Sequence, residues 1–326
     1  MSKELWVIAE HTEGRLRKVS HMALGVGRAV AGRFGLTCCA VLLGDGAEPL
    51  IRELAACGTE KIYVADDSSL SGHNYEACTA AVSALAVGGK PAVIFMGHNS
   101  LGKNMAPRLA QRLGVGLVSD CVEIDNGEDG LLFKRPVYSG KAFAWIRLTG
   151  RPAIATLRPN AFTGAAGAPV RPEVARHKTL LAAVRMRSLV RELAARAGTR
   201  PALAEADIVV SGGRGMKSAA NFALIEELAD TIGAAVGASR AVVDAGWRNY
   251  GDQVGQTGKV ISPSLYFAFG ISGALQHIAG MSSSKVIIAV DKNPEANIFK
   301  IADYGIVADA LEVLPVLTAE FKRLRG

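Results

Sequence analysis

Short apolar runs alternate regularly with segments of helical periodicity along the first half of the chain, and this alternation constrains the fold more than any other feature. The apolar runs predict buried strands at residues 5–9, 37–43, 61–65 and 92–96. The segments between and after them predict helices at residues 16–33, 49–56, 75–86 and 104–113. Strands that alternate with helices in this way form a parallel sheet that helices cover on both faces.

The pattern changes between residues 117 and 160, where short strands and turns replace the alternation. Asn126-Gly127 is a turn signal of the kind that joins antiparallel strands. We expect this segment to be a β excursion that completes a first domain. Residues 169–201 are expected to form the linker that follows it.

A second alternating series begins at Ala206. It predicts strands at residues 207–211, 234–239, 265–270 and 285–290, with another near 304–308. It predicts helices at about residues 218–232, 272–281 and 309–324. The chain is therefore expected to be α/β with two domains, residues 1–195 and 196–326, each a mostly parallel sheet with helices on both faces and the second doubly wound.

Composition indicates the cellular compartment of such a chain and whether it contains disulfides or metal sites. No apolar run approaches the roughly 18 residues that span a membrane, and the start lacks the pattern of a secretory signal or transit peptide. We expect a bacterial cytoplasmic protein, or a mitochondrial matrix protein if the chain is a mature eukaryotic one. The five cysteines include no CxxC pair, which argues against a disulfide framework or any metal site.

The net charge of +7 is unevenly distributed. Residues 1–199 carry 25 Lys and Arg against 17 Asp and Glu, whereas residues 200–326 carry 12 against 13. Much of the excess lies in residues 171–199, and nucleic-acid binding is one interpretation of such a stretch. The stretch contains no interleaved aromatic residues and no nucleic-acid motif. We therefore predict no nucleic-acid partner and favour a solvated connector or a surface that faces an acidic partner.

Glycine-containing turns flank the predicted strands of the second domain. Ser211-Gly212-Gly213-Arg214-Gly215 follows the first strand, Gln253–Lys259 precedes the third, and Gly270–His277 follows the third. Glycines let a backbone approach a ligand closely, and the N–H groups at a helix N-terminus attract an anion. Taken one at a time, each turn is also compatible with a tight turn that holds no ligand.

Polar residues at other strand ends strengthen the ligand interpretation. Arg240 follows the second strand and Asp291 the fourth, while Ser272 is a candidate N-cap for the helix after the third. His277, taken by itself, would more often be structural. Because ligands of open α/β sheets bind outside the carboxyl ends of the strands, these groups converge on one edge. A long ligand with phosphates and a ring, a dinucleotide, fits such an edge.

The order and spacing of five segments resemble those of the electron transfer flavoprotein α-subunit family. These segments are the three glycine turns named above, together with Gly237-Ala238-Ser239-Arg240 and Ala302–Asp309. The resemblance covers essentially all of residues 206–313. It implies an αβ heterodimer in which the first domain pairs with the β subunit and the second is a flavin dinucleotide-binding domain that holds FAD. The β subunit would carry AMP or a second FAD.

The resemblance also implies which residues bind FAD. Most of them lie in the turns, and two aspartates, Asp291 and Asp309, would lie near the adenosine end. The full set is Arg214, Ser239, Arg240, Gln253, Val254, Gly255, Gln256, Thr257, Gly270, Ser272, Gly273, Ala274, Leu275, Gln276, His277, Asp291 and Asp309. Arg240 near the ring would favour its negatively charged reduced states, because a fixed positive charge stabilises a negative one. Thr257 would hydrogen-bond at flavin N5 and His277 at the C2 carbonyl.

Members of this family carry electrons between other proteins. The resemblance implies an electron carrier rather than an enzyme, which accepts electrons from flavoprotein dehydrogenases such as the acyl-CoA dehydrogenases of fatty acid β-oxidation. It would deliver them to a membrane quinone oxidoreductase. The alternative is the α subunit of an electron-bifurcating complex that oxidises NADH. A nucleotide-binding stress-type protein would suit the first domain but leaves the ordered glycine turns unexplained.

Overall fold

The computed structural model describes the chain in two compact units. It describes all residues except 1, 13, 45–47, 68, 71–73, 129, 164–166, 178–186, 188–199 and 326. Unit 1 comprises Met1–Pro136 and Phe143–Arg196, and unit 2 comprises Val137–Ala142 and Ala197–Gly326. The predicted domain boundary at residues 195 and 196 falls outside the described residues. Among the described residues, no helix has the length and apolar content needed to cross a membrane.

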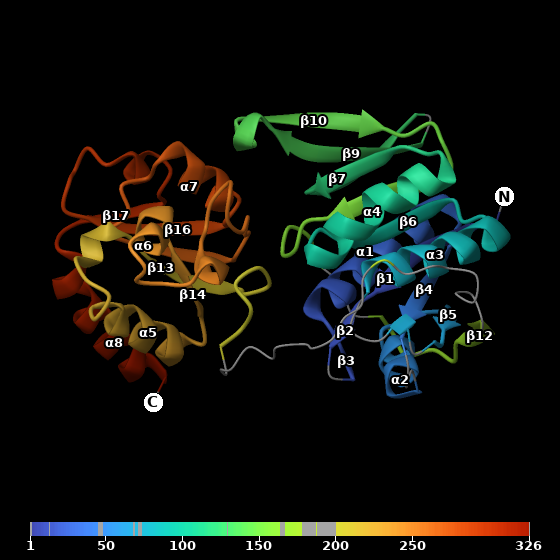
Figure 1. The fold of residues 1–326 in the computed structure, drawn as a ribbon, viewed down its shortest axis with the longest axis horizontal. Helices are drawn as coiled ribbons and strands as arrows, with labels where there is room; N and C mark the ends of the chain where they lie inside the picture. Colours follow the sequence, from blue (N-terminus) through green and yellow to red (C-terminus); the bar gives the residue numbers. More distant parts are fainter. Residues whose placement is uncertain are drawn as a thin grey trace. The chain divides into compact units, whose positions relative to one another are not determined.

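A seven-stranded sheet forms the centre of unit 1 (Figure 1). Its order is β12-β5-β4-β1-β6-β11-β7, and every neighbouring pair is parallel. The strands are β1 (Glu4–Ala9), β4 (Thr37–Leu43), β5 (Lys61–Ala65), β6 (Val93–Gly97), β7 (Leu117–Cys121), β11 (Ala153–Leu157) and β12 (Glu173–His177). The central strands are buried along almost their whole length, which explains their continuous apolar sequences.

Helices cover both faces of this sheet. One core contains the apolar sides of α1 (Lys18–Phe34) and α2 (Glu48–Ala56), and the other contains those of α3 (Tyr75–Gly89) and α4 (Ser100–Leu113). The side chain of Asn74 caps α3 and that of Asn99 caps α4, each by accepting two backbone N–H groups. A short hairpin of β2 (His11–Thr12) and β3 (Arg15–Leu16) follows β1. All five cysteines are free, and four of them are buried.

The predicted β excursion is narrower than residues 117–160. Only β8 (Glu123–Gly127), β9 (Gly130–Val137) and β10 (Ala142–Arg147) form a separate sheet, with the short 3-10 helix η2 (Tyr138–Gly140) between β9 and β10. The two ends of the predicted segment, β7 and β11, belong to the parallel sheet. Sequence patterns located the strands but could not tell which sheet each one joins.

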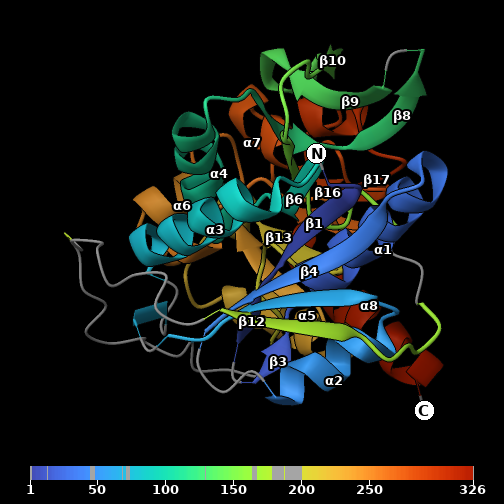
Figure 2. The same ribbon diagram turned by 90° about the vertical axis from the view of Figure 1, so that its right-hand side faces the viewer.

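The predicted linker at residues 169–201 was wrong at its start. Glu173–His177 is β12, which pairs in parallel with β5 at the edge of the sheet (Figure 2). An edge strand is exposed on most positions, so this one lacks the apolar run that identifies a buried strand. Most of the remaining linker and of the basic stretch 171–199 lies outside the described residues.

Unit 2 contains a five-stranded parallel sheet of order β14-β13-β15-β16-β17. The strands are β13 (Ile208–Gly212), β14 (Ala235–Ala238), β15 (Leu265–Phe269), β16 (Val286–Asp291) and β17 (Tyr304–Val307). From β13 the chain continues to β14 on one side of it and then crosses to β15 on the other side. The direction of winding therefore reverses between β13 and β15. In doubly wound sheets ligands bind at this point, outside the carboxyl ends of the strands.

Helices again cover both faces of the sheet. One core joins α5 (Phe222–Ile232), α6 (Arg240–Asp244) and α8 (Ala310–Arg325), and Figure 1 shows α5 and α8 side by side. The other core joins α7 (Leu275–Met281) and the 3-10 helix η5 (Asn297–Lys300). Two further 3-10 helices are η3 (Arg214–Met216) and η4 (Tyr250–Asp252). The two units confirm the predicted α/β class with mostly parallel sheets flanked by helices.

Candidate functional site

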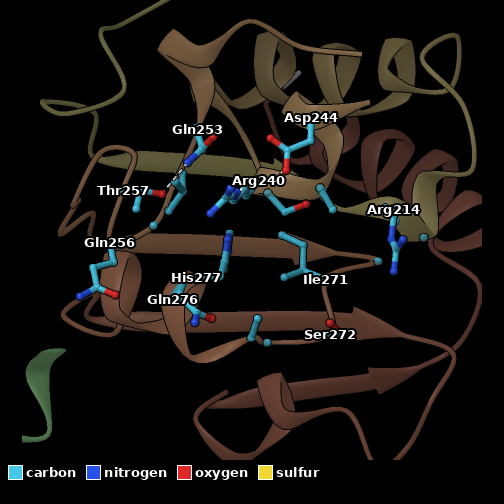
Figure 3. A pocket seen from close by; sticks show the side chains of 18 of the residues that line it. Arg214, Arg240, Asp244, Gln253, Gln256, Thr257, Ile271, Ser272, Gln276 and His277 are labelled. Atoms are coloured by element: carbon cyan, nitrogen blue, oxygen red, sulfur yellow. Dashed lines mark hydrogen bonds and ion pairs between the residues drawn. The ribbon is translucent and has the colours of Figure 1, made fainter. Parts of the chain in front are cut away.

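A cavity of about 610 Å³ lies at the carboxyl ends of the strands of unit 2. Its walls come from the turns after β13, β14 and β15, from the end of β16, and from the loop of residues 253–257. Figure 3 shows Gln256 and Arg214 at opposite ends of the labelled side chains, with Arg240 and His277 between them. The cavity is therefore elongated, with a cationic side chain near its middle and another at one end.

Backbone forms the wall where the winding of the sheet reverses. A Cβ atom on Gly213 would lie 2.1 Å from the carbonyl oxygen of Gly270, and one on Gly215 would lie 2.5 Å from the Gly270 Cα. The N–H of Gly215 donates to the Gly270 carbonyl at 3.0 Å, and Gly270 has a φ of +61°. The turns after β13 and β15 touch so closely that only glycine fits, and they leave backbone facing the cavity.

The loop before β15 is held against α7 in a similar way. A Cβ atom on Gly280 would lie 2.4 Å from the Cα of Gly255, and the N–H of Gln256 donates to the Gln276 carbonyl at 2.7 Å. Within the loop, the amide of Gln253 donates to the Thr257 hydroxyl at 3.1 Å. These contacts fix the loop as a flat wall with polar heads along it.

Two arginines supply positive charge. Arg240 begins α6, and its guanidinium lies 3.3 Å from the Asp244 carboxylate one helical turn later. The side chains of Arg240 and Asp244 are 67% and 62% exposed, so solvent screens this ion pair. Arg214 lies within the first glycine turn, where it begins η3. A ligand in the cavity therefore meets exposed cationic side chains rather than buried ones.

His277, like Gln253, is a buried polar side chain of the cavity wall, and its exposed fraction is 6%. Its Nε2 lies 2.8 Å from the hydroxyl of Tyr266. Its Nδ1 is buried and makes no hydrogen bond of ordinary geometry with the described residues, while the backbone of Val254 acts to raise the pKa of the ring. Burial lowers the pKa of His277 to about 4, so the ring is neutral near pH 7.

The structure brings together all but two of the residues predicted to bind the cofactor. The residues that line the cavity are Arg214, Ser239, Arg240, Gln253, Val254, Gly255, Gln256, Thr257, Gly270, Ser272, Gly273, Ala274, Gln276, His277 and Asp291. Ser272 was also predicted to cap the following helix, and that prediction was wrong. The helix α7 begins at Leu275 with Ala274 at its N-cap position, so Ser272 lies in the cavity wall instead.

The two predicted residues outside the wall are Leu275 and Asp309. Leu275 is 64% exposed and does not line the cavity. The carboxylate of Asp309 pairs with the ammonium groups of Lys292 at 2.8 Å and Lys217 at 2.9 Å, and it accepts the backbone N–H of Leu311 at the start of α8. Hydrogen bonds from Lys292 and then Lys217 hold the pKa of Asp309 below its usual range.

Four lining residues were missed by the sequence reasoning: Gly215, Ala241, Asp244 and Ile271. Gly215 belongs to a turn that was already singled out, and Asp244 lies four residues after Arg240, on the same face of a helix. Ala241 and Ile271 carry no polar group, so no chemical signal marked them. Among the described residues, no cluster of three or more His, Cys, Asp or Glu side chains is placed to hold a metal ion.

Comparison with known proteins gives concordant matches. The family model of the electron transfer flavoprotein domain matches residues 5–180, and that of the electron transfer flavoprotein FAD-binding domain matches residues 202–282. The electron transfer flavoprotein subunit alpha of Thermoanaerobacterium thermosaccharolyticum is 44% identical over 326 residues, 99% of each chain. That of Bacillus subtilis is 40% identical over 328 residues, again 99% of each chain. Protein FixB of Clostridium saccharobutylicum is 42% identical, over 99% of this chain and 97% of its own.

Proposed function

The chain belongs to the electron transfer flavoprotein α-subunit family, and on that premise we propose that it is the FAD-holding subunit of a heterodimeric electron carrier. One observation carries the proposal. All but two of the residues that the sequence marked for FAD, which come from four separate turns and the end of β16, surround a single elongated cavity where the winding of the unit 2 sheet reverses. That is the place where doubly wound sheets bind dinucleotides.

The residues of the cavity fit FAD. The contact between Gly213, Gly215 and Gly270 leaves no room for a Cβ and keeps the bare backbone of Gly215 and Gly270 in the cavity wall, where a pyrophosphate could approach it closely. His277 contributes a buried ring nitrogen without a hydrogen bond of ordinary geometry, as a wall that completes its bonding with a ligand would. FAD supplies the redox chemistry when it is bound, and the protein supplies binding, orientation and charge.

We assign roles to the residues as follows. Arg214 and the adjoining glycine turn hold the phosphates, and Asp291 lies toward the adenosine. The loop of residues 253–257 holds the edge of the flavin ring, with Thr257 at its N5. Arg240 places a positive charge beside the ring and so favours negatively charged reduced states.

Partners complete the proposal. The subunit name of the relatives supports a β subunit, for which we propose AMP or a second FAD as the bound nucleotide. We propose that the heterodimer accepts electrons from acyl-CoA dehydrogenase-type flavoenzymes and delivers them to a membrane quinone oxidoreductase. The bacterial relatives support the cytoplasm as its place of action.

Anaerobic electron transfer tests this function. The chain is co-expressed with its β subunit, and the flavin absorbance is followed after adding a catalytic amount of acyl-CoA dehydrogenase and an acyl-CoA. Loss of the flavin absorbance is expected, with no loss when the dehydrogenase is omitted. A flavin that stays oxidised with the dehydrogenase but is reduced rapidly by NADH alone would reject this function in favour of the bifurcating alternative.

A further inference from the structure

Tyr266 is a fully buried phenol beneath the cavity, with an exposed fraction of 0%. It lies in β15 and packs in an apolar core that includes Val209, Ile271 and Met281. A hydroxyl in such a core needs a hydrogen-bond partner, and its partner is His277, whose Nε2 lies 2.8 Å away. Tyr266 does not line the cavity itself, so it reaches the site only through that histidine.

The protonation states of the two rings follow from their burial. Burial raises the pKa of the Tyr266 phenol, which therefore keeps its O–H. Burial lowers the pKa of His277 to about 4, so the imidazole is neutral and carries one N–H. The remaining question is which ring nitrogen carries that hydrogen, because a neutral imidazole has one donor and one acceptor nitrogen.

The groups beside the two ring nitrogens both favour the tautomer that carries its hydrogen on Nδ1. The backbone of Val254 raises the pKa of His277, as an acceptor carbonyl does, and because Nε2 already contacts the phenol we place this carbonyl beside Nδ1. The group beside Nε2 is a phenol that retains its hydrogen. Placing the imidazole hydrogen on Nδ1 satisfies both contacts. Placing it on Nε2 would set the lone pair of Nδ1 against a carbonyl oxygen in a buried space, which is unfavourable.

Ser211 supports this direction of donation. Its hydroxyl is buried at the end of β13, adjoins the Tyr266 hydroxyl, and makes no hydrogen bond of ordinary geometry with the described residues. The Ser211 hydroxyl acts to lower the pKa of the Tyr266 phenol, as a group that presents its hydrogen to the phenol oxygen does, and this orientation leaves the phenol hydrogen for Nε2. The chain Ser211, Tyr266, His277 then runs in one direction toward the cavity wall.

We propose that Tyr266 is a positioning residue of the cofactor site: its hydroxyl donates to Nε2 of His277, holds the ring as the Nδ1–H tautomer, and so turns an N–H donor toward the cavity wall. The proposal rests on the proposed function for its consequence: the Nδ1–H makes no hydrogen bond of ordinary geometry with the Val254 carbonyl, so it can turn to a negatively charged flavin and favour it. Without the phenol, the ring is free to adopt the other tautomer and to present a lone pair instead.

Two measurements test the proposal on the heterodimer. The first is the ¹⁵N NMR spectrum of protein labelled at histidine, in which protonated and bare ring nitrogens resonate far apart. The His277 signals, among those of six histidines, are identified by their loss in His277→Gln. We expect a protonated Nδ1 and a bare Nε2 in the wild type with or without FAD, and a mixture of tautomers in Tyr266→Phe. A wild-type ring protonated at Nε2 would overturn the proposal.

The second measurement is the midpoint potential of the bound flavin in a double-mutant cycle. Tyr266→Phe is expected to raise the ratio of oxidised to reduced flavin at a fixed applied potential by roughly threefold to tenfold, the size of one net hydrogen bond. It should have no further effect in the His277→Gln background, and Tyr304→Phe, which alters an exposed phenol, should have none in either. An equal effect in both backgrounds would mean that Tyr266 acts through packing alone.

These readouts separate the inference from the function on which it rests. The tautomer of His277 is measured whether or not any dehydrogenase reduces the flavin. A heterodimer that binds FAD and accepts electrons from no dehydrogenase would reject the proposed function, while the NMR spectrum would still decide the role of Tyr266.

Discussion

At the scale of single residues, burial separates the groups that stay charged from those that do not. Arg240 is 67% exposed and keeps its charge in solvent, where its effect on a ligand is screened. Two histidines, His277 in helix α7 of unit 2 and His98 directly after strand β6 of unit 1, have pKa values lowered to about 4, mainly by burial. The site therefore combines an exposed cation, Arg240, whose effect is screened by solvent, with a buried neutral imidazole, His277.

Removing the charge of Arg240 should make the flavin harder to reduce. Arg240→Ala is expected to lower the midpoint potential by tens of millivolts, since about 1.4 kcal/mol of lost stabilisation corresponds to about 59 mV for one electron. Arg240→Lys is the matched control and should retain most of the potential, because it retains the charge. A redox titration that gives the same potential for the alanine variant and the wild type would remove the role assigned to Arg240.

His98 should make unit 1 sensitive to acid. Its folded-state pKa of about 4 lies below the ordinary 6.5, chiefly through desolvation and despite the Asp120 carboxylate 3.7 Å away. The unfolded chain therefore binds more protons between these values, and the free energy of unfolding falls as pH drops below about 6.5. We expect a loss of roughly 2 kcal/mol between pH 7.5 and pH 5 from this residue.

Denaturant unfolding at a series of pH values measures this loss. The His98→Gln variant should show a shallower decline in the free energy of unfolding below pH 6.5 and run parallel to the wild type above pH 7. Equal slopes for the two proteins across the acid range would contradict the assignment.

At the scale of elements, apolar periodicity in the sequence was enough to predict the buried strands and the helices that pack on them. The buried parallel strands and the helices between them lie within a few residues of their predicted positions. The edge strand β12 was missed because exposed positions break its apolar run. The start of α7 was placed too early because Ser272 has the side chain of an N-cap without the position of one. Which turns meet across the sheet is a property of strand order, so the place of Ala241 in the cavity wall could not be predicted from local sequence, whereas Ile271 lies in a turn that was singled out but carries no polar group.

The contact between the turns after β13 and β15 should be intolerant of any side chain. In Gly213→Ala the added Cβ would lie 2.1 Å from a backbone oxygen, so the two turns must separate. We expect FAD affinity to fall at least tenfold, about 1.4 kcal/mol, with a lower unfolding temperature for unit 2.

The matched control is Gly251→Ala, where a Cβ meets nothing within 4 Å. It should bind FAD as the wild type does. Equilibrium titration of the flavin-free heterodimer with FAD, followed by flavin fluorescence, compares the variants. Equal affinity for Gly213→Ala and Gly251→Ala would show that the close approach is not needed for binding.

At the scale of the whole molecule, the lining residues of the cavity belong to unit 2 alone. Unit 1 has its own sheet and its own two cores, and the family match to residues 5–180 covers it separately. Two sheets with separate cores can respond to a ligand separately, since local stability differs between cooperative regions of one chain.

Hydrogen exchange should show this separation. FAD is expected to slow amide exchange in the turns after β13 and β15 and in the loop of residues 253–257, because binding stabilises the state that binds. The central strands of unit 1, β1 and β6, should exchange at the same rate with and without FAD. Protection of β1 and β6 equal to that of the cavity turns would mean that the two units respond to FAD as one.

The most direct test of the central claim is a visible absorption spectrum of the chain co-expressed with its β subunit, titrated with dithionite and separately with NADH. We predict a yellow protein whose flavin is reduced by dithionite and left oxidised by NADH. Two flavins per heterodimer with rapid reduction by NADH would replace the carrier with the bifurcating alternative. A colourless protein that cannot take up added FAD would contradict the assignment of the unit 2 cavity as a flavin site.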